Sequence, residues 1–503
     1  MSRNNRCRPP RPGCDRSPPA IGSPRTDRPD FVNYISTRDP RAPPLALSFT
    51  DALLAGLAED GGLYVPERLP QVASDLPSFA GLPYAEIAAR LVSLFAGDAF
   101  PASELRSLAA AAYGKFRHAA VAPLVQLDEK LWLLELFHGP TLAFKDFALQ
   151  LVGLMFDAVL ARRRERVTIV GATSGDTGSA AIEACRDREA IDLFVLYPHN
   201  RISDVQRRQM TTVESPNVHA IAVEGTFDDC QDLVKSLFAD VGLRRDLNLS
   251  AVNSINWARI AAQTVYYFAA GVALGAPRRP VSFSVPTGNF GNVYAGHVAR
   301  RMGLPVEQLV IGTNRNDILA RYFASGHMTL ATVEPSLSPS MDIQVASNFE
   351  RLLFELKGRN GAAVREAMQL FRQTGSLPDD DQAWRMACRL FSAHKVGDTE
   401  TMQTIAQTHA QTGILIDPHT AVAVASARTE IVAGGNAAPM IVLGCAHPAK
   451  FPEAVERATG IRPDLPAGLP ELLERRERTV LLPNELDIVT RFIRAHSRIG
   501  ATR

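Results

Sequence analysis

Lys145 is the residue whose surroundings most directly suggest chemistry. It lies in the segment FHGPTLAFKDFALQ (137–150), at the start of a predicted helix whose apolar residues keep helical spacing up to the charges at 162–164. Phe144 and Phe147 would exclude water from its ammonium, and the positive end of the helix would repel the charge, so both favour the neutral amine. A neutral lysine is a nucleophile that forms a Schiff base with a carbonyl, either a substrate's or that of pyridoxal phosphate (PLP).

Because most lysines are solvated surface residues, Lys145 has to be judged by what accompanies it. A predicted buried strand at 167–170 is followed by the turn GATSGDTG (171–178) and by a helix of small residues at 179–185. This order leaves backbone N–H groups and a positive helix end facing the carboxyl end of the strand, where an anion can bind. The turn lacks the Gly-Lys-Ser/Thr ending of a nucleotide P-loop, so we set that alternative aside.

The same order of strand, glycine-containing turn and helix is predicted at two further places. One predicted strand precedes PTGNFGN (286–292), and another precedes GCAHPAK (444–450). Gly288 and Gly291 allow the backbone to wrap closely round a phosphate. Each loop alone is more often an ordinary turn than a site. Since the carboxyl ends of parallel strands meet at one edge of a sheet, the three junctions and Lys145 predict an α/β protein with one convergent small-molecule site.

Composition excludes several other classes of protein. The 503 residues are 46% hydrophobic, enough for two or three domains with a buried core. The net charge of +1 gives no reason to expect nucleic acid or an acidic membrane surface as a partner. Six cysteines lack paired or metal-ligand spacing, which suits a reducing compartment and predicts neither disulfides nor a metal site. The longest uncharged run, 260–277, contains polar residues and glycines, so a buried helix explains it better than a membrane span.

We expect residues 1–32 to be a disordered tail. The first 30 residues contain seven prolines and seven arginines but only five apolar residues, too few for a packed element. A basic targeting arm is one alternative, although the prolines oppose an amphipathic helix. A start codon assigned too far upstream explains the tail equally well.

The rest of the chain changes pattern several times. Helical patterns occur at 48–57, 84–95 and 103–113, and short apolar runs begin after about residue 120. The expected parts are a small N-terminal domain (33–120), a catalytic region of two α/β subdomains (121–475), a mostly helical insertion within that region (about 348–412) and a C-terminal segment (476–503).

Separate blocks of sequence carry a family resemblance that covers nearly everything after residue 33. The blocks are YISTR (34–38), DGGLYVP (60–66), FHGPTLAFKD (137–146), GATSGDTGSAA (171–181), NSINWAR (253–259), PTGNFGN (286–292), SMDIQVASNFER (340–351), DPHTA (417–421) and AHPAKF (446–451). In these blocks the chain resembles the threonine synthase family, PLP enzymes of the tryptophan-synthase-β-like fold (fold type II). The resemblance implies parallel sheets flanked by helices, with a small N-terminal domain.

The resemblance also implies roles for single residues toward the cofactor. Lys145 is similar to the lysine that forms the Schiff base with PLP, and Asp176 to a residue near the ring hydroxyl. The residues that resemble the loop holding the cofactor phosphate are Gly288, Asn289, Phe290, Gly291 and Asn292.

For the substrate, the resemblance implies two groups of residues. Those similar to residues that receive the substrate carboxylate are Thr173, Ser174 and Thr177. Asn256 and Arg259 are weaker matches for the substrate phosphate, and an arginine on a helix surface is an equal alternative for Arg259.

Cys445 departs from the family pattern, because related sequences commonly have threonine there, with its hydroxyl facing the pyridine nitrogen of PLP. A thiol is a weaker hydrogen-bonding partner than a hydroxyl, but it is also neutral. A neutral partner leaves the ring nitrogen largely unprotonated, unlike the carboxylate used by aminotransferases. The departure bears on cofactor geometry and leaves the reaction class unchanged.

The implied function is conversion of O-phospho-L-homoserine and water to L-threonine and phosphate, the last step of threonine biosynthesis. One alternative is a PLP-dependent serine/threonine dehydratase-like enzyme, which needs no phosphate pocket. Another is a catalytically inactive homologue that binds PLP or a phosphoamino acid. The expected partner is a small-molecule substrate, and neither nucleic acid nor a membrane is expected as a partner. We expect the protein to be cytoplasmic and to be a monomer or a homodimer.

Overall fold

The computed structural model describes residues 32–250, 255–434 and 438–499. Of the predicted tail, only Val32 belongs to the described residues, where it is half-buried and packs against the main hydrophobic core. The rest of that expectation lies outside them. Within the described ranges, no helix combines the length and the apolar character needed to cross a bilayer.

The larger sheet has six strands in the order β11-β10-β9-β12-β4-β3. The β3–β4 pair is antiparallel, and the other neighbouring pairs are parallel. Val442 lies opposite Ser284, so the loops that follow β9 and β12 leave the sheet side by side. The strands are β3 (Leu124–Gln126), β4 (Leu131–Glu135), β9 (Val281–Pro286), β10 (Val306–Thr313), β11 (Phe391–Lys395) and β12 (Met440–Gly444).

The second sheet has five parallel strands in the order β13-β7-β6-β5-β8. Its strand β5 leads directly into the glycine turn at 171–178, as the sequence predicts. The strands are β5 (Val167–Ala172), β6 (Ile191–Pro198), β7 (Val218–Glu224), β8 (Leu249–Ser250) and β13 (Val480–Pro483).

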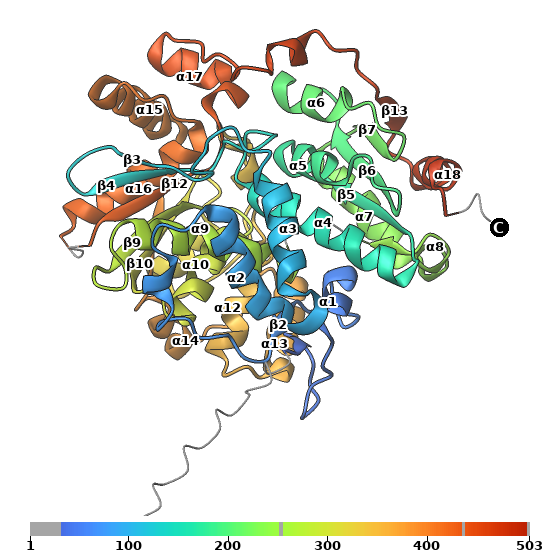
Figure 1. The fold of residues 1–503 in the computed structure, drawn as a ribbon, viewed down its shortest axis with the longest axis horizontal. Helices are drawn as coiled ribbons and strands as arrows, with labels where there is room; N and C mark the ends of the chain where they lie inside the picture. Colours follow the sequence, from blue (N-terminus) through green and yellow to red (C-terminus); the bar gives the residue numbers. More distant parts are fainter. Residues whose placement is uncertain (1–31, 251–254, 435–437, 500–503) are drawn as a thin grey trace, which may run out of the picture.

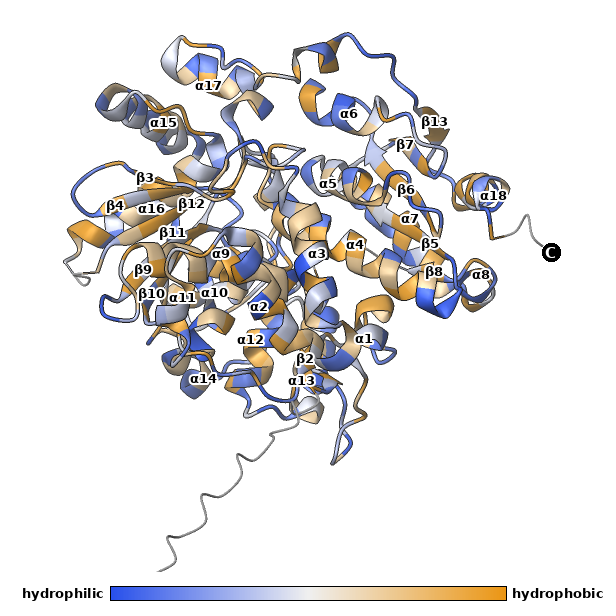
Figure 2. Ribbon diagram, in the orientation of Figure 1, coloured by the Kyte–Doolittle hydropathy of each residue, from blue (hydrophilic) through white to orange (hydrophobic). Residues whose placement is uncertain are grey.

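Helix α4 (Lys145–Arg163) lies between the two sheets (Figure 1) and packs against α5 and α9. It is apolar on most sides, as its colouring in Figure 2 shows, because it is surrounded by other elements. The uncharged run predicted to be a buried helix is α9, and it packs against α10. These helices are α5 (Asp176–Cys185), α9 (Trp257–Ala273) and α10 (Gly291–Arg301).

The N-terminal elements cover one side of this core. The predicted helices at 48–57, 84–95 and 103–113 are present, and α2 packs against both α3 and α9. A two-stranded antiparallel sheet, β1 with β2, accompanies them. The elements are β1 (Tyr34–Ser36), α1 (Phe49–Ala55), β2 (Tyr64–Pro66), η1 (Leu76–Phe79), α2 (Tyr84–Ala96), η2 (Gly97–Ala99) and α3 (Ala102–Tyr113).

The region 348–412 contains strand β11 as well as helices. Because β11 pairs in parallel with β10, this region supplies the edge strand of the larger sheet and is not wholly separate from it. The hydrophobic pattern did not predict that strand. The helices around it are α11 (Ile318–Ser325), η3 (Pro339–Met341), α12 (Phe349–Leu356), α13 (Gly361–Thr374), α14 (Asp381–Ala387) and α15 (Asp398–Thr412).

The C-terminal segment adds to the second sheet, because β13 pairs with β7 and buried residues of α18 join the core beneath that sheet. The predicted helix at 453–458 is α17. The remaining helices are α6 (Asp204–Thr211), α7 (Phe227–Ala239), α8 (Val241–Asp246), α16 (Pro418–Val432), η4 (Pro448–Lys450), α17 (Pro452–Thr459), η5 (Pro470–Leu473) and α18 (Leu486–His496).

Candidate active site

Lys145 is the first residue of α4, at the wall of a cavity between the two sheets. The loop before it is tied to the loop that follows β12. The N–H of Phe144 donates to the carbonyl oxygen of Cys445 at 2.8 Å, and the N–H of His447 donates to that of Leu142 at 3.0 Å. These backbone bonds fix the start of α4 beside Cys445, so residues about 300 positions apart in the sequence share one cavity.

The surroundings of Lys145 favour its neutral amine. The side chain is 10% exposed, and its Nζ lies 5.1 Å from the centre of the Phe144 ring. Burial lowers the pKa of Lys145, the neighbouring Asp176 opposes this effect, and the charge of Lys450 adds to the lowering. The pKa of Lys145 is therefore lowered, as the flanking aromatic residues predict, and Lys450 contributes to the lowering.

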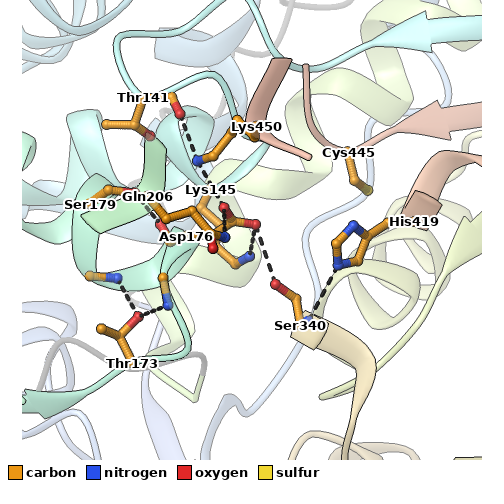
Figure 3. A network of polar contacts seen from close by, with 12 residues as sticks. Thr141, Lys145, Thr173, Asp176, Ser179, Gln206, Ser340, His419, Cys445 and Lys450 are labelled. Carbon is orange, nitrogen blue, oxygen red and sulfur yellow. Dashed lines mark hydrogen bonds and ion pairs between the residues drawn. The ribbon is translucent and has the colours of Figure 1, made fainter. Parts of the chain in front are cut away.

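Asp176 is the carboxylate at the centre of the site (Figure 3). Its Oδ2 accepts from Lys145 Nζ at 3.1 Å and from Ser340 Oγ at 3.3 Å. Its Oδ1 contacts Lys450 Nζ at 2.8 Å and accepts from Gln206 Nε2 at 2.9 Å. Burial would raise the pKa of Asp176, but the nearby cationic groups outweigh burial and hold this pKa well below its usual value.

The loop at 286–292 lines another wall of the cavity and ends at the first turn of α10. Phe290 has a left-handed backbone (φ 63°) and caps α10 without a side-chain hydrogen bond. The first-turn N–H groups of a helix have no intrahelical partner, so they can bind an anion here. A Cβ at Gly288 would lie 2.8 Å from the carbonyl oxygen of Ser340, which explains the need for glycine.

Asn292 joins this loop to Cys445. Its Oδ1 accepts from the hydroxyls of Tyr266 at 2.6 Å and Tyr267 at 3.1 Å, which orients the amide. Its Nδ2 then points to Cys445 Sγ at 3.8 Å. Burial raises the pKa of the Cys445 thiol well above its usual value, so the cavity has a neutral thiol at this point.

Arg259 is buried at the same cavity, 3% exposed, on the first turn of α9. Its Nε and Nη1 have no hydrogen-bond partner among the described residues. Burial lowers the pKa of this guanidinium to about 10, which leaves it charged at neutral pH. A buried cation with unused donors is costly unless an anion completes it, so Arg259 indicates an anionic ligand.

Most of the residues predicted for the site line the cavity. They are Lys145, Asp176, Thr177, Arg259, Gly288, Asn289, Phe290, Gly291, Asn292 and Cys445.

Three others lie outside the residues that line the cavity. Thr173 Oγ1 accepts from the N–H groups of Gly175 and Gly178, at 3.0 and 2.8 Å, and so holds the turn. Asn256 caps α9 and donates to the carbonyl oxygen of Leu53 at 2.8 Å. Ser174 is half-buried and is not among the residues that line the cavity.

Sequence reasoning missed several polar residues of the site, among them Ser340, His419, Gln206 and Lys450. Ser340 and His419 line the cavity with Lys145, whereas Gln206 and Lys450 contact Asp176 from behind. His419 Nδ1 lies 2.7 Å from Asp417 Oδ2, and its Nε2 accepts from the N–H of Ser340 at 3.3 Å. Position was one available signal for Lys450, since AHPAK follows a predicted strand and precedes a predicted helix. Ser340 and His419 lie in the blocks SMDIQVASNFER and DPHTA, which carry the family resemblance.

The residues present suit PLP. The donors at 286–292 and the start of α10 can take its phosphate, Lys145 its carbonyl carbon, and Asp176 its ring hydroxyl. The neutral Cys445 thiol can face its pyridine nitrogen. Each functional group of the cofactor thus has a partner of the right chemistry in one cavity.

Comparison with known proteins agrees with this fit. A family model described as "Pyridoxal-phosphate dependent enzyme" matches residues 116–443, so the fold and cavity are those of a PLP-dependent enzyme of fold type II. Models described as "Threonine synthase N terminus" and "Threonine synthase, C-terminal" match residues 33–113 and 420–493. The chain belongs to the threonine synthase family.

Individual relatives are similar over nearly their whole length. The chain is 56% identical to "Threonine synthase" of Pseudomonas aeruginosa, covering 93% of this chain and 99% of that protein. The structure of PLP-bound threonine synthase from Brucella melitensis superposes with a TM-score of 0.89 at 52% identity, over 93% of this chain and 100% of that chain. Threonine synthase from yeast gives a TM-score of 0.87 at 38% identity, over 94% and 99%.

Proposed function

We propose that this protein is a threonine synthase that converts O-phospho-L-homoserine and water to L-threonine and inorganic phosphate. The observation that carries the choice of substrate is the buried guanidinium of Arg259, whose Nε and Nη1 have no hydrogen-bond partner among the residues that the structure describes. The 286–292 loop and the start of α10 suit the cofactor phosphate, so a second cationic group at the cavity fits a second phosphate. A phosphorylated amino acid supplies one.

Bound PLP supplies conjugation that stabilises negative charge on the carbon atoms of the substrate amino acid. The protein has to hold the cofactor and keep its ring nitrogen unprotonated. The 286–292 loop would hold the phosphate, Asp176 would face the ring hydroxyl, and Cys445 would offer the nitrogen a neutral thiol.

Lys145 is the proton-transfer group of the proposal. Its Nζ lies in the cavity, burial lowers its pKa, and in the uncharged form it can take a proton from a carbon atom of the bound substrate and return it. Asp176, 3.1 Å away, fixes the position of this amine. Thr177 lines the same wall and can receive the substrate carboxylate with its hydroxyl and the first-turn N–H groups of α5.

Arg259 binds the substrate phosphate and then the phosphate product. A proton leaves Cα and a second proton leaves Cβ, and the electrons from Cβ form a Cβ–Cγ double bond as the C–O bond at Cγ breaks with its own electrons passing to phosphate. A proton is then added at Cγ, the oxygen of water adds at Cβ while its proton is released, and Cα regains a proton. Arg259 favours the leaving group because its charge is buried and its Nε and Nη1 donate to none of the described residues. A serine/threonine dehydratase would not need this guanidinium.

The test compares amino acids as substrates of the PLP-loaded protein. O-Phospho-L-homoserine should give equal amounts of threonine and phosphate, with kcat/KM far above that for L-serine. Arg259→Leu should lower kcat/KM for O-phospho-L-homoserine by at least about 100-fold, because charge-assisted hydrogen bonds contribute about 1.5–3 kcal/mol each. The exposed Arg372→Leu is the matched control and should change nothing.

Two outcomes would overturn the assignment. If kcat/KM for serine dehydration equalled that for O-phospho-L-homoserine, the dehydratase alternative would be correct. If PLP bound and no amino acid were turned over, the inactive-homologue alternative would be correct.

The substrate is a small molecule. We expect the enzyme to be cytoplasmic and to be a monomer or a homodimer. The four cysteines of the described residues, Cys185, Cys230, Cys388 and Cys445, are free thiols, which supports a reducing compartment.

A further inference from the structure

Lys450 is a second lysine of the site. It ends η4, and its side chain is completely buried. Its Nζ donates to the carbonyl oxygen of Thr141 at 2.8 Å and contacts Asp176 Oδ1 at 2.8 Å. A buried ammonium is tolerated only when it is paired, so this lysine depends on Asp176. It does not line the cavity and therefore acts on a reaction there only through other groups.

Lys145 and Lys450 share one carboxylate. Lys450 and Gln206 contact Oδ1 of Asp176, the oxygen on the side away from Lys145, while Lys145 and Ser340 contact Oδ2. Figure 3 shows the two ammonium groups on either side of Asp176. The carboxylate therefore keeps a cationic partner even when Lys145 is uncharged.

Of the two lysines, Lys145 is the one whose charge is more easily lost. Two ammonium groups on the one carboxylate of Asp176 repel each other in a buried site, and this disfavours one of them. Lys450 has two acceptors and is wholly buried, whereas Lys145 lines the cavity next to the Phe144 ring. The neutral form therefore belongs to Lys145.

Other titratable groups face this pair from several elements. Asp146 on α4 accepts from Thr141 and feels the charge of Lys450, with burial raising its pKa to about 6. His419 on α16 lowers the pKa of Asp176, and the Cys445 side chain raises the pKa of Lys145. All of these groups are retained in the variants below, so a difference between variants reports on position 450.

We propose that Lys450 is a positioning residue that holds and neutralises Asp176 and thereby keeps Lys145 in its uncharged, nucleophilic form whenever Lys145 is free. This inference rests on the proposed role of Lys145 and identifies what sets its protonation. A like charge beside a lysine disfavours the ammonium, and a carboxylate already paired with Lys450 attracts a second ammonium less strongly. Both effects disappear when the charge at position 450 is removed.

The experiment titrates the PLP-loaded protein with pH and follows the visible absorption of the bound cofactor, which changes with the protonation of the Lys145 nitrogen in its link to PLP. The charge at position 450 disfavours a proton on this nitrogen as it does on the free amine. Lys450→Met should move the midpoint up by about one pH unit, since a charge at this range shifts a pKa by about 1–3 units. The acidic limb of kcat/KM for O-phospho-L-homoserine should move the same way. Lys450→Arg keeps the charge and should restore the wild-type midpoint.

Gln206→Leu is the matched control, because it removes a neutral donor from the same oxygen of Asp176 and changes no charge. It should leave the midpoint within a few tenths of a unit. If Lys450→Met does not fold, Lys450→Gln, which can still donate to Thr141, replaces it with the same expectation. An unchanged midpoint in the uncharged variant, or an equal shift in Gln206→Leu, would overturn the proposal.

The spectral titration needs no substrate, so it separates this inference from the proposed function. A wild-type protein that makes threonine while Lys450→Met keeps its midpoint contradicts only the role of Lys450. A wild-type protein that makes no threonine contradicts the proposed function, whatever the titration shows.

Discussion

Lys145 has the properties of a nucleophile because of its immediate neighbours. Burial lowers its pKa, and among the described residues Asp176 is the one carboxylate that contacts its Nζ, at 3.1 Å. An exposed lysine such as Lys235, with 70% of its side chain accessible, has no such environment. The difference between the two lysines is one of position and can be tested by removing each in turn.

Lys145→Ala should abolish the covalent link to PLP and lower turnover at least about 1,000-fold, because nucleophile and proton-transfer group are lost together. Borohydride reduction followed by peptide mass spectrometry locates the link. Lys235→Ala should keep both link and turnover. A Lys145→Ala protein with wild-type turnover would exclude this residue from catalysis.

Cys445 is predicted to face the pyridine nitrogen of PLP, and its buried thiol is neutral. Cys445→Thr should keep activity within about threefold, because a hydroxyl is a stronger neutral partner of similar volume. Cys445→Asp should attract a proton to the ring nitrogen and raise abortive keto-acid formation relative to threonine. The product ratio of each variant is the measurement.

If Cys445→Asp matched the wild type in both products and rate, Cys445 would not face the ring nitrogen. The matched control for the added buried charge is Cys185→Asp, which lies away from the cavity in α5 and should affect folding rather than the product ratio.

The sequence revealed single site residues unevenly. Lys145 and the glycines are visible because their types are unusual in their context, and Cys445 because it departs from a family pattern. Lys450 and Gln206 could not be found in this way, because a lysine and a glutamine are ordinary surface residues until the fold buries them against Asp176. Arg259 remained balanced between surface and site until its burial was known.

The residues at which helices begin determine which side chains and backbone N–H groups lie at the site. α5 begins at Asp176, three residues before the predicted start, and this places the carboxylate in its first turn. Gly175 caps the helix with φ 128°, and a Cβ there would lie 2.4 Å from the side chain of Gln206. A side chain at this position would therefore displace a partner of Asp176.

Gly288→Ala tests the fit of the 286–292 loop. The added Cβ would lie 2.8 Å from the carbonyl oxygen of Ser340, so the loop has to shift. Overpacking costs about 1–3 kcal/mol, and we expect PLP to bind at least about tenfold more weakly, as measured by equilibrium titration. Gly397→Ala is the control, because nothing lies within 4 Å of its Cβ position. Equal affinities in both variants would mean that this loop does not hold the cofactor.

Elements with a clear period could be predicted, whereas edge strands could not. The buried strands β5, β9 and β12 appear as continuous apolar runs, and α2 and α3 as amphipathic helices. β11 and β13 lie at sheet edges and are mostly half-exposed. β11 carries neither a continuous apolar run nor a helical period, and the apolar run of β13 is too short to predict a strand by itself. Only pairing with β10 and β7 makes them strands.

At the scale of the whole molecule, two sheets with α4 between them bring distant segments to one cavity (Figure 1). The convergence of strand ends was predictable, since parallel strands deliver their loops to one edge. The order of the strands and the closing of the cavity by Ser340 and Met341 were not, because they depend on contacts between residues far apart in the chain.

Deletion of residues 1–31 should leave activity and melting temperature unchanged. Their composition gives no packed core, and the "Threonine synthase N terminus" match begins at residue 33. Val32 is kept because it packs against the main core. Thermal unfolding and kcat/KM of the shortened and full chains are the measurements, and a loss of several degrees would show that the tail contributes to folding.

The central claim, that phosphate leaves by cleavage of the C–O bond at Cγ and that water enters at Cβ, is tested most directly by the reaction in water labelled with oxygen-18. Mass spectrometry of the products should find the label in the hydroxyl of threonine and none in the released phosphate. Labelled phosphate together with unlabelled homoserine would instead show hydrolysis of the phosphate ester, and would contradict the proposed function.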